Sequence, residues 1–363
     1  MLWEKIMKIE KQMKLSDAPL ALTFDDVSLV PVHSTIKSRK EPDVSTSVAG
    51  MKLKIPIIAS PMNTISEGAM AQVMNEIGAG CVVHRYMPAV RQVEIYKRLT
   101  GWEGIWFAIG ATGDYLERAR MLYEARVKHF CIDVASGHSQ TLLDAVESLR
   151  RAFPDISVMA GNVTSYDGAY NLASYGVNAI RIGIGSGSAC KTRVVTGFGV
   201  PLLSTLEECW ELKKIYPQIS LIADGGCRSS GDMVKALCFS DAVMTGRLLA
   251  GTDETPGEIK NYESNAIYNQ DRCGKFKKYA GMASKEGREF NGWFSEESSS
   301  YVPEGISTEV PYQGPVSKVI ENLVGGIKVG MSYANARTLE ELRKNAKFVR
   351  ITNAGYAEGL PRT

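Results

Sequence analysis

A glycine-rich loop with one cysteine is the segment most suited to chemistry. It spans residues 183–193, with glycine at every second position over Gly183–Gly187, then Cys190 and Thr192. Such glycines either form a tight turn or leave backbone amides open to a phosphate. Cysteines are commonly small core hydrophobes, and we expect this of the other six. Cys190 lies in a polar loop, where a thiol stays accessible. The loop therefore predicts nucleophilic chemistry on a phosphorylated substrate.

This loop resembles the active-site loop of the IMP dehydrogenase/GMP reductase family, which usually reads G-x-G-P-G-S-x-C-x-T. Ser186 stands where that pattern has proline, and the remaining positions fit. In the family, the cysteine bonds covalently to purine C2. The resemblance runs from about Leu22 to about Gly355 and so covers most of the chain.

Short apolar segments must position this loop. Eight of them, mostly alternating with helix-like periods, are predicted strands: 55–60, 81–84, 105–109, 129–134, 156–160, 178–184, 220–223 and 241–244. The alternation predicts a parallel sheet, and eight repeats predict an α/β protein with a closed (β/α)8 TIM barrel. Polar residues and glycines follow the strands on the face that carries active sites in such barrels: Ser60, Asp133, Asn162, Cys190, Asp224 and Gly246.

We expect a single TIM-barrel catalytic domain over residues 1–363. Residues 1–20 read as a leader, either a short amphipathic helix or a disordered segment. Residues 264–312 depart from the barrel pattern, and the resemblance implies an active-site flap there. Only the predicted helix 89–99 separates the second and third strands, so there is no room for the regulatory CBS module that most IMP dehydrogenases insert at that point.

Composition limits the classes of partner. A net charge of +2 gives no electrostatic argument for nucleic acid or membrane binding, and no apolar stretch approaches membrane-spanning length. The seven cysteines are scattered without a CxxC pair, which argues against a zinc site or a disulfide framework. We therefore expect a cytoplasmic protein.

The resemblance implies a role for each site residue. Cys190 is the nucleophile, and Thr192 and Glu304 handle protons. The expected substrate-binding residues contact the base, ribose or phosphate of a purine nucleoside monophosphate: Ser60, Met62, Ser188, Asp224, Gly226, Gly246, Arg247, Tyr279, Gly281 and Met282. The expected nicotinamide-side residues are Asp133, Asn162, Gly183 and Gly185, and a potassium ion would bind the carbonyls of Gly185, Gly187 and Cys190.

Arg247 departs from the family, which usually has Ser or Gly at this phosphate-side position. Two interpretations stay open. The guanidinium either adds a bidentate phosphate contact or turns outward as a solvated charge. In the first case Arg247 would alter the preference for phosphate-chain length.

The reaction we expect is that of a GMP reductase: NADPH-dependent reductive deamination of GMP to IMP and ammonia through a Cys190 thioimidate. The dehydrogenase flap reads D-R-Y-F, whereas Asn291–Phe294 lacks both the Arg and the Tyr. The missing CBS module and Thr196–Gly197 agree with a reductase. An IMP dehydrogenase using NAD is the alternative, because Pro303–Gly305 and Phe348–Ile351 look closer to bacterial dehydrogenases. A second alternative is a catalytically inactive purine-nucleotide-binding protein, although such a protein would not need the Cys190 thiol. The resemblance also implies a homotetramer.

Overall fold

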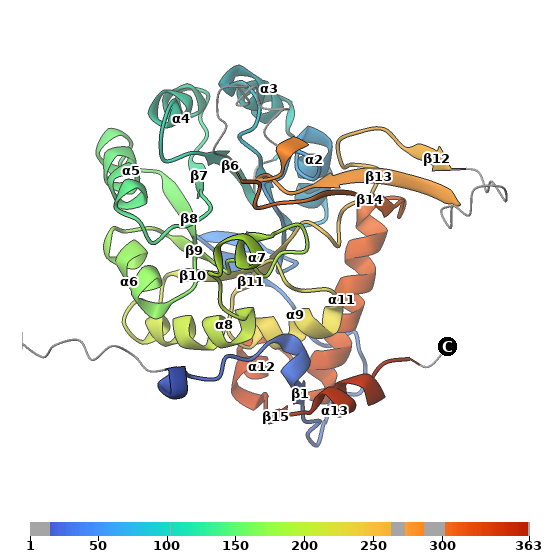
Figure 1. Ribbon diagram of the computed structural model, residues 1–363. Coiled ribbons are helices and arrows are strands. Elements are labelled where there is room, and N and C mark those ends of the chain that lie inside the picture. The colour runs from blue at the N-terminus through green and yellow to red at the C-terminus, as the bar shows by residue number, and fades with distance from the viewer. Residues whose placement is uncertain (1–14, 102, 263–272, 287–301, 362–363) are drawn as a thin grey trace, which may run out of the picture.

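The computed structural model describes residues 15–101, 103–262, 273–286 and 302–361. Its centre is a closed barrel whose neighbouring strands are all parallel (Figure 1). The strands are β4 Ile57–Ala59, β5 Gly80–Val83, β6 Ile105–Ile109, β7 His129–Asp133, β8 Ser157–Val163, β9 Ala179–Ile182, β10 Ser220–Asp224 and β11 Ala242–Thr245. The predicted (β/α)8 barrel is confirmed.

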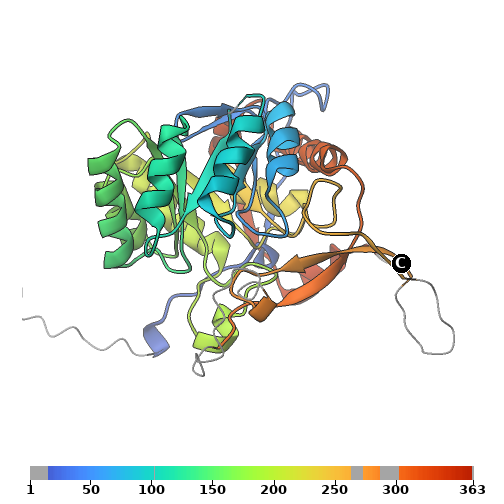
Figure 2. The same ribbon diagram turned by 90° about the horizontal axis from the view of Figure 1, so that it is seen from above.

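Helices surround the barrel, as the view from above shows (Figure 2). They are α2 Gly68–Glu76, α3 Ala89–Arg98, α4 Tyr115–Glu124, α5 Gln140–Ala152, α6 Tyr166–Ser174, α8 Leu202–Trp210, α9 Ser230–Leu237 and α11 Val316–Tyr333. Ser139, Ser165 and Ser229 begin α5, α6 and α9, since each hydroxyl accepts a backbone N–H of the first turn. Helix α11 packs between α9 and α2 and so completes the outer ring.

A hairpin closes the amino-terminal end of the barrel. It consists of β2 Thr46–Val48 and β3 Met51–Leu53. Its side chains join the interior core of the barrel, which includes Trp106 and Met159. Backbone atoms of Ala49 bond to the hydroxyls of Ser157 and Ser220, at the starts of β8 and β10. Because this end is plugged, the carboxyl ends of the strands are the open face.

The two ends of the described chain meet in a small sheet. Strand β1 Val27–Leu29 pairs antiparallel with β15 Phe348–Arg350. A 3₁₀ turn at Phe24–Asp26 directly precedes β1. Between α11 and β15 lies α12 Leu339–Asn345, and α13 Asn353–Glu358 follows β15.

A three-stranded antiparallel sheet projects from the barrel (Figure 1). It contains β12 Lys260–Tyr262, β13 Gly274–Ala280 and β14 Ser307–Pro311. The predicted flap region, 264–312, overlaps this sheet. Parts of that region lie outside the described residues, including Asn291–Phe294, and so does most of the predicted leader.

Two expectations were wrong. Strand β8 continues to Val163 instead of stopping at Ala160, because Gly161 and Val163 still pair with β9 across a register shift. Cys273 is exposed, although we expected every cysteine except Cys190 to lie in the core. It directly precedes β13, which belongs to the three-stranded sheet and not to the barrel.

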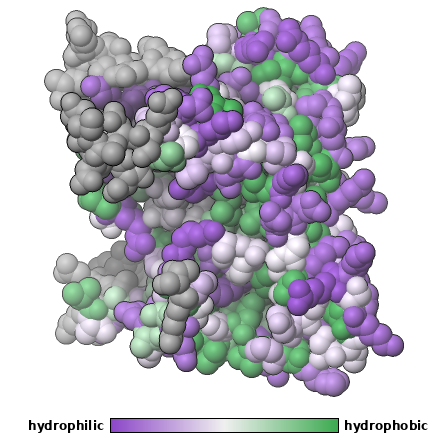
Figure 3. All heavy atoms as spheres, turned by 90° about the vertical axis from the view of Figure 1, so that its right-hand side faces the viewer, coloured by the Kyte–Doolittle hydropathy of each residue, from purple (hydrophilic) through white to green (hydrophobic). Residues whose placement is uncertain are grey.

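The visible outer face mixes hydrophilic and hydrophobic side chains (Figure 3). Among the described helices, none combines the length and apolar content that crossing a bilayer requires.

Candidate active site

A cavity of about 480 Å³ lies at the carboxyl ends of the barrel strands. Every site residue expected from the sequence lines it: Ser60, Met62, Asp133, Asn162, Gly183, Gly185, Gly187, Ser188, Cys190, Thr192, Asp224, Gly226, Gly246, Arg247, Tyr279, Gly281, Met282 and Glu304. The structure thus brings together residues that lie up to 244 positions apart, from Ser60 to Glu304. Their individual roles stay predictions.

A continuous donor chain links the exposed thiol to a carboxylate. The Cys190 thiol donates to the Thr192 hydroxyl at 3.2 Å, and this hydroxyl donates to Glu304 Oε2 at 2.8 Å. Burial raises the pKa of the Cys81 and Cys131 thiols to about 12, whereas Cys190 is exposed. The arrangement can carry a proton from the thiol to Glu304 through Thr192.

Backbone pairing holds this chain in place. Cys190 and Gly305 form an antiparallel bridge. The Ile306 N–H donates to the Ala189 carbonyl at 3.0 Å, and the Gly281 N–H donates to the Ile306 carbonyl at 2.8 Å. A Cβ on Gly281 would lie 2.7 Å from the Ala189 oxygen, so only glycine permits this approach. The loop after β9 and the segments flanking the projecting sheet therefore form one unit.

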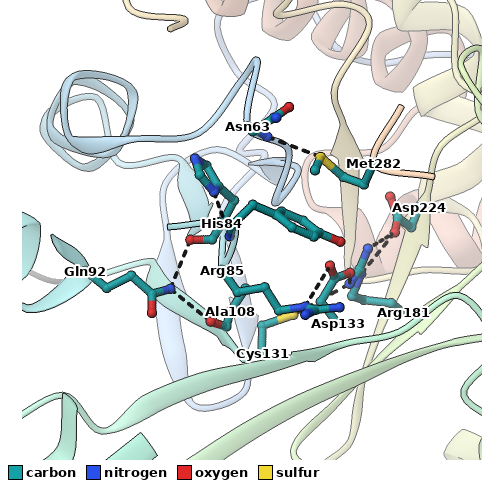
Figure 4. Close-up of polar contacts among 11 residues, drawn as sticks. Asn63, His84, Arg85, Gln92, Ala108, Cys131, Asp133, Arg181, Asp224 and Met282 are labelled. Atoms are coloured by element: carbon teal, nitrogen blue, oxygen red, sulfur yellow. Dashed lines mark hydrogen bonds and ion pairs between the residues drawn. The ribbon is translucent and has the colours of Figure 1, made fainter. Parts of the chain in front are cut away.

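A buried arginine that the sequence reasoning missed organises two carboxylates (Figure 4). Arg181 in β9 is 6% exposed. Its Nη1 lies 2.5 Å from Asp133 Oδ1, and its Nη2 and Nε lie 2.7 and 3.0 Å from Asp224 Oδ2. Strands β7, β9 and β10 place these groups side by side at the floor of the cavity. A charged residue inside an apolar run was the available signal, because a buried charge needs a partner.

Asn162 belongs to the same cluster. Its Nδ2 donates to Asp224 Oδ2 and to the Gly183 carbonyl, both at 2.8 Å. The sequence reasoning assigned Asn162 to the nicotinamide side and Asp224 to the ribose. The structure joins them by a hydrogen bond, so Asn162 also fixes the orientation of Asp224.

A pair of hydroxyl groups also lines the cavity. Ser188 Oγ and Tyr279 Oη lie 3.2 Å apart, and burial raises the pKa of Tyr279. A Cβ on Gly246 would lie 3.6 Å from the Tyr279 hydroxyl and only 2.6 Å from Met62 Sδ. Glycine at this position therefore keeps the backbone close to the hydroxyl pair.

Lys277 anchors the strand that carries Tyr279. It is 2% exposed, and its Nζ donates to the Thr255 carbonyl at 2.5 Å and to the Thr252 carbonyl at 3.1 Å. Burial lowers its pKa, which Asp253 partly offsets. These carbonyls belong to the segment after β11, so the ammonium ties β13 to the barrel.

Arg85 and Tyr86 also line the cavity, although neither was predicted from the sequence. The guanidinium carbon of Arg85 lies 4.9 Å from the centre of the Tyr86 ring, and its Nε lies 4.0 Å from Asp133 Oδ2. Both follow the buried His84, whose Nδ1 accepts the Tyr86 N–H at 3.0 Å and whose Nε2 lies 3.2 Å from Glu67. That contact lowers the pKa of Glu67. Figure 4 shows Arg85 directed toward Asp133.

The potassium site at the carbonyls of Gly185, Gly187 and Cys190 stays a prediction. The Gly187 carbonyl accepts the Cys190 N–H at 3.0 Å, and a carbonyl oxygen has a second lone pair. Within the described ranges, no group of three or more His, Cys, Asp or Glu side chains could hold a metal ion. A cation here would therefore depend on backbone carbonyls.

Comparison with known proteins decides the family. The family model described as "IMP dehydrogenase / GMP reductase domain" matches residues 21–362. The chain belongs to this family. The IMP dehydrogenase of Bacillus subtilis (strain 168) is 33% identical over 365 residues, which cover 96% of this chain and 73% of that protein. The IMP dehydrogenase of Borreliella burgdorferi is 31% identical, with 94% and 96% covered.

Other curated relatives match over a smaller part of their length. The IMP dehydrogenase of Nitrosopumilus maritimus is 38% identical over 262 residues, which cover 70% of this chain but 53% of that protein. Among solved structures, a cysteine-to-alanine variant of Trypanosoma brucei GMP reductase, in complex with guanosine 5'-monophosphate, is similar. Its TM-score is 0.84 at 26% identity, with 96% of this chain and 99% of that chain covered. The chain is thus an oxidoreductase-family TIM barrel of purine metabolism.

Proposed function

We propose that this protein is a GMP reductase, which converts GMP, NADPH and a proton to IMP, ammonia and NADP⁺. The hydrogen-bonded chain from Cys190 through Thr192 to Glu304 carries the proposal. It supplies both a nucleophile for purine C2 and a proton route to the amine that leaves. The GMP-bound neighbour supports a purine nucleoside monophosphate as substrate.

The chemistry divides into an addition, an elimination and a reduction. Cys190 Sγ forms a bond to C2 as its proton passes through Thr192 to Glu304. Glu304 returns a proton through Thr192 to the C2 amine, and the C2–N bond breaks to release ammonia, which leaves a thioimidate on Cys190. NADPH, when bound, would provide the hydride that C2 needs. Cys190 would then depart with the electron pair of the C–S bond and take up a proton from solvent, which restores the thiol as IMP is released.

The remaining cavity residues orient the substrate. Arg181 and Asn162 occupy Asp224 Oδ2, so Asp224 Oδ1 would accept from the ribose diol. Ser188, Tyr279 and the backbone at Gly226 and Gly246 would bind the phosphate. A further set would line the base pocket: Ser60, Met62, Gly281 and Met282.

The cofactor side and the cation site follow the sequence prediction. Asp133, Asn162, Gly183 and Gly185 would hold the nicotinamide. The carbonyls of Gly185, Gly187 and Cys190 would hold potassium, which would stiffen the loop that carries the thiol. We also propose a cytoplasmic homotetramer of single-domain subunits, with a flap over 264–312 and without a CBS module. The short connection between β5 and β6, which contains α3, supports the last point.

An IMP dehydrogenase is the second candidate, because the curated relatives named above are IMP dehydrogenases. We favour the reductase because a dehydrogenase must hydrolyse its thiol adduct. The Arg and Tyr that serve this step in the family are absent from Asn291–Phe294. A catalytically inactive binding protein is disfavoured by the intact chain of Cys190, Thr192 and Glu304.

The deciding experiment follows nicotinamide absorbance in two mixtures: GMP with NADPH, and IMP with NAD and potassium. Cys190→Ala serves as the control in each. We expect oxidation of NADPH with release of ammonia, both abolished in the variant. Sustained formation of NADH and XMP would instead establish the dehydrogenase. Inactivity in both mixtures would favour the inactive binding protein.

A further inference from the structure

Four arginines line the cavity, and three of them face carboxylates. Arg181 pairs with Asp133 and Asp224. Arg85 lies 4.0 Å from Asp133, and Arg228 pairs with Asp25 and Asp232. Over the ranges that the structure describes, no carboxylate forms an ion pair with Arg247. It is therefore the cavity arginine whose charge is available to an anionic ligand.

Arg247 lies outside the hydroxyl pair. Its guanidinium carbon is 5.9 Å from the centre of the Tyr279 ring, and its side chain is exposed. Tyr279 is only 4% exposed, and its hydroxyl meets Ser188 inside the cavity. Going outward, a ligand thus meets the two hydroxyls first and the guanidinium second.

We infer that Arg247 forms a subsite for a second phosphate, so that the cavity also binds purine nucleoside 5′-diphosphates. This inference rests on the proposed function, which places the first phosphate at Ser188, Tyr279 and Gly246. The second phosphate of a diphosphate extends from the first toward solvent and reaches the exposed part of the cavity where Arg247 lies. A guanidinium binds phosphate oxygens through paired N–H donors, which makes it suited to this charge. Arg247 is then a specificity-determining residue for the length of the phosphate chain.

The test compares ligands of increasing charge on the full chain by titration calorimetry. The ligands are guanosine, GMP and GDP, and the proteins are wild type, Arg247→Ser and Arg247→Lys. Arg120→Ser is the matched control, because Arg120 is an exposed arginine on α4 that does not line the cavity. We expect the dissociation constant of the wild type for GDP to be at most about threefold that for GMP. Arg247→Ser should weaken GDP by about tenfold or more and GMP by less than about threefold. The GDP affinity of Arg247→Lys should lie between those of the wild type and Arg247→Ser.

Three results would overturn the inference. Equal weakening of GMP and GDP would place Arg247 on the first phosphate. Unchanged GDP affinity would make it a solvated charge. Failure of the wild type to bind GDP would exclude the subsite. The calorimetric comparison measures binding and needs no turnover. If GMP binds but is not reduced in the activity assay, the proposed reaction is refuted. The affinities for GMP and GDP still decide the second-phosphate subsite in that case. A melting temperature equal to that of wild type confirms that Arg247→Ser is folded.

Discussion

Replacing Arg181 by methionine removes the buried cation between two partly buried carboxylates while keeping most of the side-chain volume. Asp133 and Asp224 are 13% and 11% exposed, and three contacts of 2.5 to 3.0 Å join them to Arg181. Removing one partner of a buried ion pair typically costs 3–5 kcal/mol, because the remaining charge is uncompensated. We therefore expect Arg181→Met to lower the free energy of unfolding by about 3–5 kcal/mol at pH 7.

Urea unfolding, followed by circular dichroism, measures this loss. Arg181→Lys keeps the charge without the paired geometry and should lose less. Adding Asp133→Asn to Arg181→Met removes one uncompensated charge and should recover part of the stability, which makes the pair non-additive. A loss below about 1 kcal/mol at pH 7 would refute the role of Arg181 as the organising cation.

Three further predictions concern other parts of the molecule. Thr192→Val should lower kcat for GMP reduction by about a hundredfold or more, because it interrupts the proton route from Cys190 to Glu304. The GMP affinity measured by calorimetry should change little, and a near-normal kcat would exclude this proton route. Since hydrogen bonding to His84 lowers the pKa of Glu67 from 4.5, Glu67→Gln should lower the free energy of unfolding by roughly 1 kcal/mol at pH 7. That difference should vanish in urea titrations as the pH falls below 4.5, through the lowered pKa; a pH-independent difference would contradict this cause. Gly281→Ala should destabilise the protein by about 1–3 kcal/mol, because its methyl group would lie 2.7 Å from the Ala189 carbonyl oxygen. The control Gly325→Ala, with no atom within 4 Å of its new methyl group, should not destabilise it. Equal melting temperatures of the two variants would disprove the close approach at Gly281.

The sequence alone determined the features that depend on neighbours along the chain. Apolar runs of strand length and helical periods predict the barrel, because each strand buries both faces and each helix buries one. Gly176, with φ of +81°, follows the end of α6, and glycine at such a position is a local signal for the end of a helix. The glycine turn after β9 likewise predicted an exposed Cys190. These signals are local, so they can be identified without knowing the fold.

The contacts between distant segments were decided only by the tertiary structure. The sequence named Thr192 and Glu304 through a family resemblance, but their 2.8 Å contact depends on the bridge between Cys190 and Gly305. The apolar run around Arg181 signalled that its charge needs a partner, but only the fold shows that strands β7 and β10 supply the two carboxylates.

Lys277 was missed for a similar reason. In the sequence it belongs to a basic stretch, Lys275–Lys278, of which the two outer lysines are exposed. The folded chain buries its ammonium against the Thr252 and Thr255 carbonyls. A charge is stable in such a place only where groups from elsewhere in the chain surround it. Pattern along one segment cannot reveal those groups, because closure of the barrel brings them together.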